Sequence, residues 1–267
     1  MEFWKMHGAG NDFIILDNRP LGLNDHQLQR LAAQLCARRV SVGADGLIAV
    51  EEPQQGGDFR MRFWNADGTA GEMCGNGARC ICRYGYDRGL AGPVQHIETT
   101  AGEITGWRIS ENQYRIRLQE PSVLEYRQSS LGPVVYLELG TPGLPHCLYP
   151  VSPEALDDGQ QLLPLARTLR YDPAFPKGAN VNFYCVTGAQ SVRIRTYERG
   201  VEDFTLACGT GAGALTAALT RSGQVSGPVA VTSLGGTLTV LDHDGLFLTG
   251  PADVAYRGIT TDFTPQL

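Results

Sequence analysis

The chain has 267 residues, of which 42% are hydrophobic and 19% charged, a composition typical of a globular protein with one or two domains. Its net charge is −6 and it has no basic run, which argues against a nucleic-acid surface. No apolar stretch is long enough to span a membrane, and the first residues lack the pattern of a signal peptide, so we expect a cytoplasmic protein.

The first half of the chain predicts strands around two helices. Apolar runs on either side of a glycine turn at 7–12 predict two strands between residues 3 and 17. Asn24 is a candidate helix cap before leucines at helical spacing. We expect further strands at 47–50, 59–64, 94–99, 103–109 and 113–119, and a short helix through Arg79 to Tyr84.

The second half repeats this plan after the Glu120-Pro121 step, which marks a domain boundary. We expect strands at 134–139, 179–186, 191–197, 228–232, 237–241 and 245–249, and helices at 162–169 and 211–221. Both halves are therefore α+β, each a mostly antiparallel sheet wrapped around a central helix. The expected domains are 1–119 and 120–267, and the last strand may return to the first.

One motif occurs twice. Cys74-Gly75-Asn76-Gly77-Ala78 reappears as Cys208-Gly209-Thr210-Gly211-Ala212, at an offset of 134 residues (208 − 74). The offset is about half the chain length. The repeat predicts two similar domains that face one another, with one thiol from each and the active site in the cleft between them.

Such a turn at the start of a helix has a definite chemistry. Its glycines let a ligand approach the backbone, and the first N–H groups of the helix bind a carboxylate. The helix dipole also lowers the pKa of a cysteine placed there. Two converging copies predict a two-base inversion of an α-carbon, in which a thiolate removes the proton and a thiol returns one from the opposite side. This reaction needs no cofactor.

Other functions are less compatible with the residues. Only Lys5 and Lys177 are lysines, and neither lies in a convincing context for a pyridoxal-phosphate enzyme. The chain has no phosphate-binding Gly-Lys-Ser/Thr motif. A zinc site lacks a second ligand pair beside Cys74, Cys80 and Cys82, and a redox pair lacks Cys-x-x-Cys. The remaining cysteines are expected to be buried in the core.

Six segments together closely resemble the diaminopimelate epimerase family over nearly the whole chain. They are His7–Phe13 (HGAGNDF), Gly43–Leu47 (GADGL), Asn65–Gly68 (NADG), Met73–Arg79 (MCGNGAR), Tyr197–Val201 (YERGV) and Leu206–Gly211 (LACGTG). The resemblance implies the two-domain fold of that family, an amino-acid substrate, no cofactor or metal, and a homodimer. It also implies that Cys74 and Cys208 are the acid–base pair.

The same resemblance assigns the substrate contacts. The reacting carboxylate would be held by Gly75, Asn76, Gly209 and Thr210. The far amino-carboxylate end would be read by Asn11, Asn65, Asn180, Glu198 and Arg199, and His146 would lie beside the second thiol. An adjacent anion and cation suit a zwitterionic end. The alternatives are an exposed surface ion pair for Glu198 and Arg199, and a packed loop histidine for His146.

Two departures from the family pattern affect the far end of the substrate. The family asparagine before the histidine aligns with Leu144 or, with a gap, with Thr141. The segment from Arg199 to Cys208 is also one residue longer than usual, with Glu202-Asp203-Phe204 where Gly-Glu is expected.

Three functions remain open on the sequence. The leading hypothesis is the interconversion of LL- and meso-diaminopimelate in lysine and peptidoglycan biosynthesis. The second is a racemase of the same fold acting on another amino acid, such as histidine. The third is a non-catalytic amino-acid-binding protein.

Overall fold

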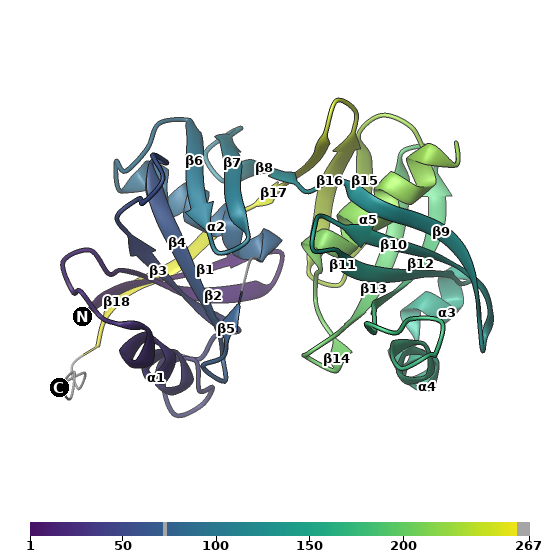
Figure 1. The fold of residues 1–267 in the computed structure, drawn as a ribbon, viewed down its shortest axis with the longest axis horizontal. Coiled ribbons are helices and arrows are strands. Elements are labelled where there is room, and N and C mark those ends of the chain that lie inside the picture. Colours follow the sequence, from purple (N-terminus) through teal and green to yellow (C-terminus); the bar gives the residue numbers. More distant parts are fainter. Residues whose placement is uncertain (72–73, 261–267) are drawn as a thin grey trace. The chain divides into compact units, whose positions relative to one another are not determined.

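The computed structural model describes residues 1–71 and 74–260, in two compact units (Figure 1). Unit 1 comprises Met1–Ile116 and Gly250–Leu267, and unit 2 comprises Arg117–Thr249. The division therefore lies slightly before the boundary expected after residue 119, and the C-terminal segment groups with unit 1. The chain passes from one unit to the other within β8 (Gln113–Leu118) and returns within β17 (Leu246–Pro251).

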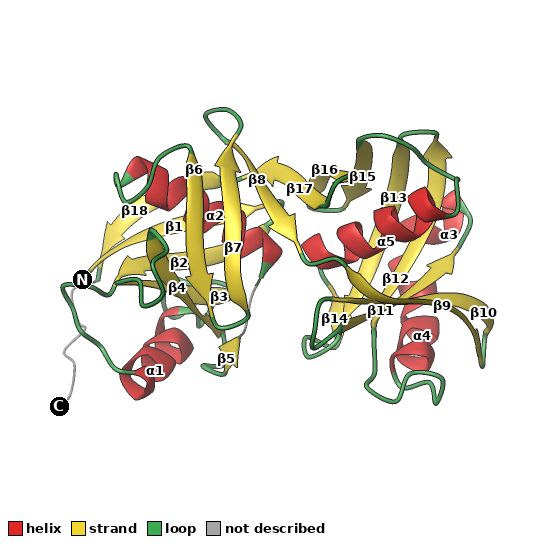
Figure 2. Ribbon diagram, turned by 45° about the horizontal axis from the view of Figure 1, so that its top comes forward, coloured by secondary structure: helices red, strands yellow, loops and turns green. Residues whose placement is uncertain are grey.

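Unit 1 is a mostly antiparallel sheet with two helices. Helix α2 lies among the strands, and α1 packs against β3 and β4. Strand β1 pairs with β2 and β18, and the two parallel pairings join β2 to β3 and β4 to β6. Helix α2 packs against β1, β2 and β7 (Figure 2). Besides β8 and β17, the elements of unit 1 are β1 (Glu2–Gly8), β2 (Asn11–Asp17), α1 (Asp25–Leu35), β3 (Gly46–Glu51), β4 (Phe59–Asn65), β5 (Ala70–Gly71), α2 (Gly75–Asp87), β6 (Val94–Thr99), β7 (Gly102–Arg108) and β18 (Asp253–Ile259).

The apolar run of β2 is continuous because both faces of the strand are covered. Ile14 and Leu16 pack with the leucines of α1 in one core, whereas Phe13 lies near Gly77 of α2. Helix α1 begins at the capping box predicted from Asn24, whose side chain accepts the Gln27 N–H at 3.0 Å. Strand β2, helix α1 and the Asn24 cap thus form where the sequence pattern predicted them.

Unit 2 has the same construction around α5, which packs against β9 to β12, β15 and β16. Helices α3 and α4 contribute Leu156, Leu162, Ala166 and Leu169 to a core shared with the sheet. The elements are β9 (Pro121–Ser129), β10 (Gly132–Leu139), β11 (Leu144–Pro150), α3 (Pro153–Asp157), α4 (Gly159–Arg170), β12 (Asn180–Gly188), β13 (Ser191–Glu198), β14 (Asp203–Phe204), α5 (Gly209–Arg221), β15 (Val229–Ser233) and β16 (Gly236–Asp242).

The repeat seen in the sequence extends to the topology. Helices α2 and α5 both have 13 residues and start 134 positions apart (209 − 75). The parallel pairs β2–β3 and β4–β6 of unit 1 correspond to β11–β12 and β13–β15 of unit 2. The α+β class with two similar domains is confirmed.

The sequence pattern did not predict strands β5, β9, β11, β14 and β18 or helix α3. Strand β9 begins at Pro121, where only a domain boundary was expected, and most of its side chains are exposed, so its apolar pattern is weak. Strand β18 is also largely exposed. Among the helices described, none is long and apolar enough to cross a membrane.

Candidate active site

Both repeated cysteines cap the N-terminus of a helix, as the sequence predicted. Cys74 has extended backbone angles (φ −130°, ψ 121°) directly before α2, and Cys208 does the same (φ −115°, ψ 110°) before α5. We call residues 74–79 the Cys74 turn and residues 208–213 the Cys208 turn. Neither helix has an acidic residue in its first turn, so the positive end of each helix dipole is not offset by a carboxylate there. Met73 of the motif lies outside the described residues.

The Cys74 turn is bonded to Asn11. The Cys74 thiol donates to Asn11 Oδ1 at 3.5 Å, and Asn76 Nδ2 donates to the same oxygen at 3.3 Å. Asn11 Nδ2 in turn donates to Asp45 Oδ2 at 2.6 Å. Because a carboxylate only accepts, Asp45 fixes the direction of the Asn11 amide and keeps its oxygen toward Cys74. An oxygen in this position favours the protonated thiol.

Asp45 is itself held by a charged cluster. Arg38 Nη2 bonds Asp45 at 2.9 Å and Asp12 at 2.6 Å, and Lys5 Nζ lies 2.7 Å from Asp12. Burial alone would raise the pKa of the Asp12 carboxyl, but its bonds from Arg38 and Lys5 outweigh this effect and hold the pKa below its ordinary value. The sequence had selected only Asn11 from this cluster.

Asn65 is placed differently. It ends β4, is exposed, and donates from Nδ2 to Thr69 Oγ1 at 3.0 Å within the turn that follows. Of the residues expected to bind substrate in unit 1, the structure thus joins Asn11, Gly75 and Asn76 to Cys74, and places Asn65 in a solvent-facing turn.

Unlike Cys74, Cys208 accepts a hydrogen bond from the backbone of its own helix. Its sulfur accepts the Gly211 N–H at 3.3 Å and lies 3.4 Å from Thr210 Oγ1. An N–H donated to sulfur stabilises the thiolate more than the thiol. Gly211 has no room for a side chain, because a Cβ there would come within 2.4 Å of Asn182 Oδ1.

His146 lies fully buried in β11 beside Asn182 of β12. Asn182 Nδ2 faces the carbonyl oxygens of Cys147 and Asn180, both at 3.2 Å, and its Oδ1 accepts from Thr196 Oγ1 at 2.9 Å. The same amide nitrogen lies 3.3 Å from His146 Nδ1. Burial first, and then the charge of Arg199, lower the pKa of His146 to about 3. The ring is neutral, and its buried Nε2 has no hydrogen-bond partner among the described residues.

The remaining predicted residues lie where β12 begins and β13 ends. Asn180 is buried and pairs in register with His146, and its Oδ1 accepts the Arg199 N–H at 2.8 Å. Glu198 accepts from Thr205 Oγ1. The Arg199 side chain is exposed, with Nη1 donating to the Lys177 carbonyl at 3.0 Å. Unit 2 thus gathers the expected residues around the Cys208 turn and β12.

The two departures from the family pattern form ordered turns. A cis Thr141-Pro142 bond follows Gly140, and Leu144 begins β11. In the lengthened segment, Glu202 has a positive φ of 58° and accepts from Arg170 of α4 at 2.7 Å and from the Gly200 N–H at 3.0 Å. Glu202 therefore ties the longer turn to α4.

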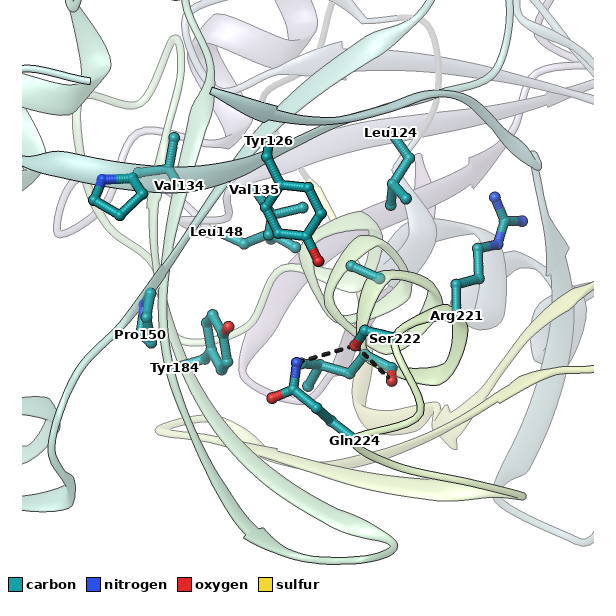
Figure 3. Close-up of a pocket in the computed structure, with 13 residues that line it drawn as sticks. Leu124, Tyr126, Val134, Val135, Leu148, Pro150, Tyr184, Arg221, Ser222 and Gln224 are labelled. Carbon is teal, nitrogen blue, oxygen red and sulfur yellow. Dashed lines mark hydrogen bonds between the residues drawn. The ribbon is translucent and has the colours of Figure 1, made fainter. Parts of the chain in front are cut away.

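A cavity of about 400 Å³ in unit 2 does not belong to this site (Figure 3). It lies between the β9–β12 strands and the last turn of α5, at the opposite end of that helix from Cys208. Tyr126, Tyr184 and Arg221 are among the residues that line it, and none of the predicted site residues does.

Sequence reasoning missed two buried residues of the site, Asn182 and the side chain of Arg79. Asn180 and Asn182 are two apart on a strand, so the same face carries both, which was a usable signal. Arg79 was quoted only as part of a motif. Its guanidinium is fully buried and donates to Asn76 Oδ1 at 2.8 Å.

Comparison with known proteins agrees with these observations. The family model for diaminopimelate epimerase matches residues 3–119 and 140–254. The diaminopimelate epimerase of Aquifex aeolicus is 37% identical over 97% of both chains, and that of Chlorobaculum tepidum is 38% identical over 96% of this chain and all of its own. The chain belongs to the diaminopimelate epimerase family.

Solved structures show how widely this fold occurs. A PhzF-family phenazine biosynthesis protein of Bacillus anthracis matches with a TM-score of 0.73 at 16% identity, over 97% of this chain and 98% of its own. A hydroxyproline epimerase of Agrobacterium vitis matches with a TM-score of 0.66 at 17% identity, over 97% and 91%. As a member of the diaminopimelate epimerase family, the protein is an isomerase.

Proposed function

We propose that the protein interconverts LL- and meso-diaminopimelate by a cofactor-independent exchange of the α-proton between two thiols, Cys74 and Cys208. The observation that carries the proposal is the duplicated helix cap: each cysteine stands at the N-terminus of a helix whose first N–H groups face an incoming ligand. The proposal places the reacting carboxylate against Gly75 and Asn76 on one side and Gly209 and Thr210 on the other.

We infer the resting protonation of the two thiols from their hydrogen bonds. Cys208 accepts an N–H and Cys74 donates to Asn11, so Cys208 is the base and Cys74 the acid in the substrate-free protein. Cys208 takes the α-proton and becomes a thiol, while Cys74 gives its proton to the other face and becomes a thiolate. One turnover leaves the pair with reversed protonation, ready for the opposite isomer.

The far end of the substrate is proposed to be read by Asn11, Asn65, Asn180, Glu198 and Arg199, with His146 beside the second thiol. The changes at Thr141 and Leu144 remove an amide expected there. A lost hydrogen bond to a charged group weakens binding by about 1.5–3 kcal/mol, which lowers affinity without excluding the substrate. Location in the cytoplasm and a homodimeric state remain predictions.

The test is α-proton exchange in deuterium oxide, followed by NMR with LL-diaminopimelate and with a panel of other L-amino acids that includes histidine. Exchange and inversion of diaminopimelate alone are expected. Exchange of a different amino acid would keep the two-thiol mechanism and show that the turns at 140–144 and 199–208 change the substrate. Binding without any exchange would indicate an amino-acid-binding protein.

A further inference from the structure

Arg79 stands out among the cations of unit 1. It is 0% exposed, and no other arginine in the described ranges, 1–71 and 74–260, is buried. Besides its bond to Asn76, Nη1 donates to the Gly75 carbonyl and Nε to the Pro251 carbonyl, both at 3.3 Å. All three acceptors are uncharged oxygens. Within those same ranges no carboxylate forms an ion pair with this guanidinium.

A buried charge without a counter-charge is costly, and neighbouring cations avoid that cost. Lys5 is also buried but has Asp12 at 2.7 Å. Arg83, one turn further along α2, lies 3.4 Å from Asp87 and 3.9 Å from Asp253 of β18. Arg79 is moreover close to the positive end of the α2 dipole, so its charge adds to that end rather than offsetting it. The unpaired guanidinium and the positive end of the helix dipole together favour an anion at the N-terminus of α2.

Cys74 is the nearby group that can supply this anion. Burial raises the pKa of the Cys80 and Cys82 thiols, that of Cys82 to about 12, so both stay protonated. Burial lowers the pKa of Arg79, and negative charge on Cys80, Cys74 or Cys82 would oppose this; of the three thiols only that of Cys74 is partly exposed. The interaction is mutual, so the guanidinium favours the Cys74 thiolate. Asn11 favours the Cys74 thiol, so the opposing effects of Asn11 and Arg79 allow Cys74 to exist both as a thiol and as a thiolate.

The two halves of the repeat differ at this position. The residue of the Cys208 turn that corresponds to Arg79 is Gly213 (79 + 134), whose Cα faces Leu118. The positive charge is therefore a feature of unit 1 and not a general requirement of the repeated turn.

We propose that Arg79 is a positioning residue for Cys74. The positive charge of its buried guanidinium stabilises the Cys74 thiolate, and it then stabilises the carboxylate of the substrate. Its bond to Asn76 Oδ1 also fixes that amide with Nδ2 toward Asn11. The part that concerns the carboxylate rests on the proposed function. The part that concerns the thiolate does not.

The first experiment needs no substrate. In a Cys208→Ala background, the rate at which iodoacetamide alkylates Cys74 is followed against pH by peptide mass spectrometry. Arg79→Met should raise the pKa of Cys74 by about one unit, which slows alkylation about tenfold below that pKa. Arg79→Lys keeps the charge and should leave the pKa near its original value. Arg83→Met is the matched control, because Arg83 also donates to a β17–β18 carbonyl, that of Ala252 at 2.7 Å, and should not shift the pKa.

The second experiment uses the Cys208-containing protein and α-proton exchange. Arg79→Met should lower kcat/KM on the order of 100-fold, mainly through kcat, because the carboxylate gains negative charge as the proton leaves. Arg79→Lys should lose less. If the unsubstituted protein exchanges no amino acid, the proposed function fails while the alkylation result still decides the role of Arg79.

A purely structural Arg79 would give a different pattern. A folded Arg79→Met protein, verified by circular dichroism, with an unchanged Cys74 pKa would overturn the proposal, as would an equal shift in Arg83→Met. If Arg79→Met does not fold, Arg79→Gln retains a donor for Asn76 without the charge.

Discussion

Six of the seven cysteines are buried, and five of these six lie away from the helix N-termini, namely Cys36, Cys80, Cys82, Cys147 and Cys185. Burial raises the pKa of each of these five thiols, to about 12 for Cys36 and Cys82. These residues behave as small apolar side chains, as the sequence predicted. Only Cys74 and Cys208 stand at helix N-termini among the described residues, and this position sets them apart chemically.

Replacing either helix-capping cysteine should therefore stop inversion without unfolding the protein. Cys74→Ala and Cys208→Ala are each expected to lower the inversion rate by about 10²–10⁴-fold, since each removes one proton-transfer group. The measurement is optical rotation or NMR of the substrate, with circular dichroism for the fold. Cys185→Ala is the control and should stay active. A fully active Cys74→Ala or Cys208→Ala protein would contradict the two-thiol mechanism.

His146 should make unit 2 less stable in acid. Its folded pKa of about 3 lies below the ordinary value of 6.5, so the unfolded chain takes up a proton between these values and the folded chain does not. Stability should fall as the pH drops through 6.5, by about 2 kcal/mol from pH 7 to pH 5. Urea unfolding at both pH values should show a smaller loss for His146→Gln. Equal losses in the two proteins would mean that His146 is not held neutral.

At the scale of the helix, glycine in the repeated turn has different roles in the two units. A Cβ on Gly77 would lie 3.1 Å from Ile48 Cδ1, the mobile end of a side chain. A Cβ on Gly211 would lie 2.4 Å from Asn182 Oδ1 and 3.3 Å from Cys208 Cβ. Asn182 cannot move without releasing His146, so the second turn has far less tolerance.

The matched pair Gly77→Ala and Gly211→Ala tests this difference. Gly211→Ala should lower the free energy of unfolding by about 1–3 kcal/mol and reduce activity, because it displaces Asn182. Gly77→Ala should cost less, since Ile48 can adjust and alanine favours the helix. Thermal unfolding and exchange assays measure both effects. A larger loss for Gly77→Ala would argue against a rigid Asn182.

The helices that carry the thiols were predictable because their glycines, caps and repeat are local signals in the sequence. The Asn24 cap and the continuous β2 run were predictable for the same reason. What the sequence could not show were contacts fixed by tertiary structure, such as the hydrogen bond from Asn11 to Asp45 or the contact between Asn182 and His146. Strand β9 escaped notice because its exposed side chains carry no apolar pattern.

At the scale of the whole molecule, the proposed mechanism brings one thiol from each unit to a single α-carbon. Oxidation should then join Cys74 to Cys208 as a disulfide and abolish activity. The measurement is activity before and after a mild oxidant, with mass spectrometry of the linked peptides, and a reductant should restore both. Activity that withstands oxidation would count against two thiols sharing one substrate.

The pairing of β1 with β18 has a consequence for synthesis on the ribosome. Met1 and Thr260 exchange two backbone hydrogen bonds, of 3.0 and 2.9 Å, and Arg79 and Arg83 find acceptors at Pro251 and Ala252. Unit 2, in contrast, is one continuous segment. The nascent chain can complete unit 2 while residues 1–116 still lack their last strand. The Cys74 helix therefore obtains its contacts with Pro251 and Ala252 only after unit 2 has been synthesised.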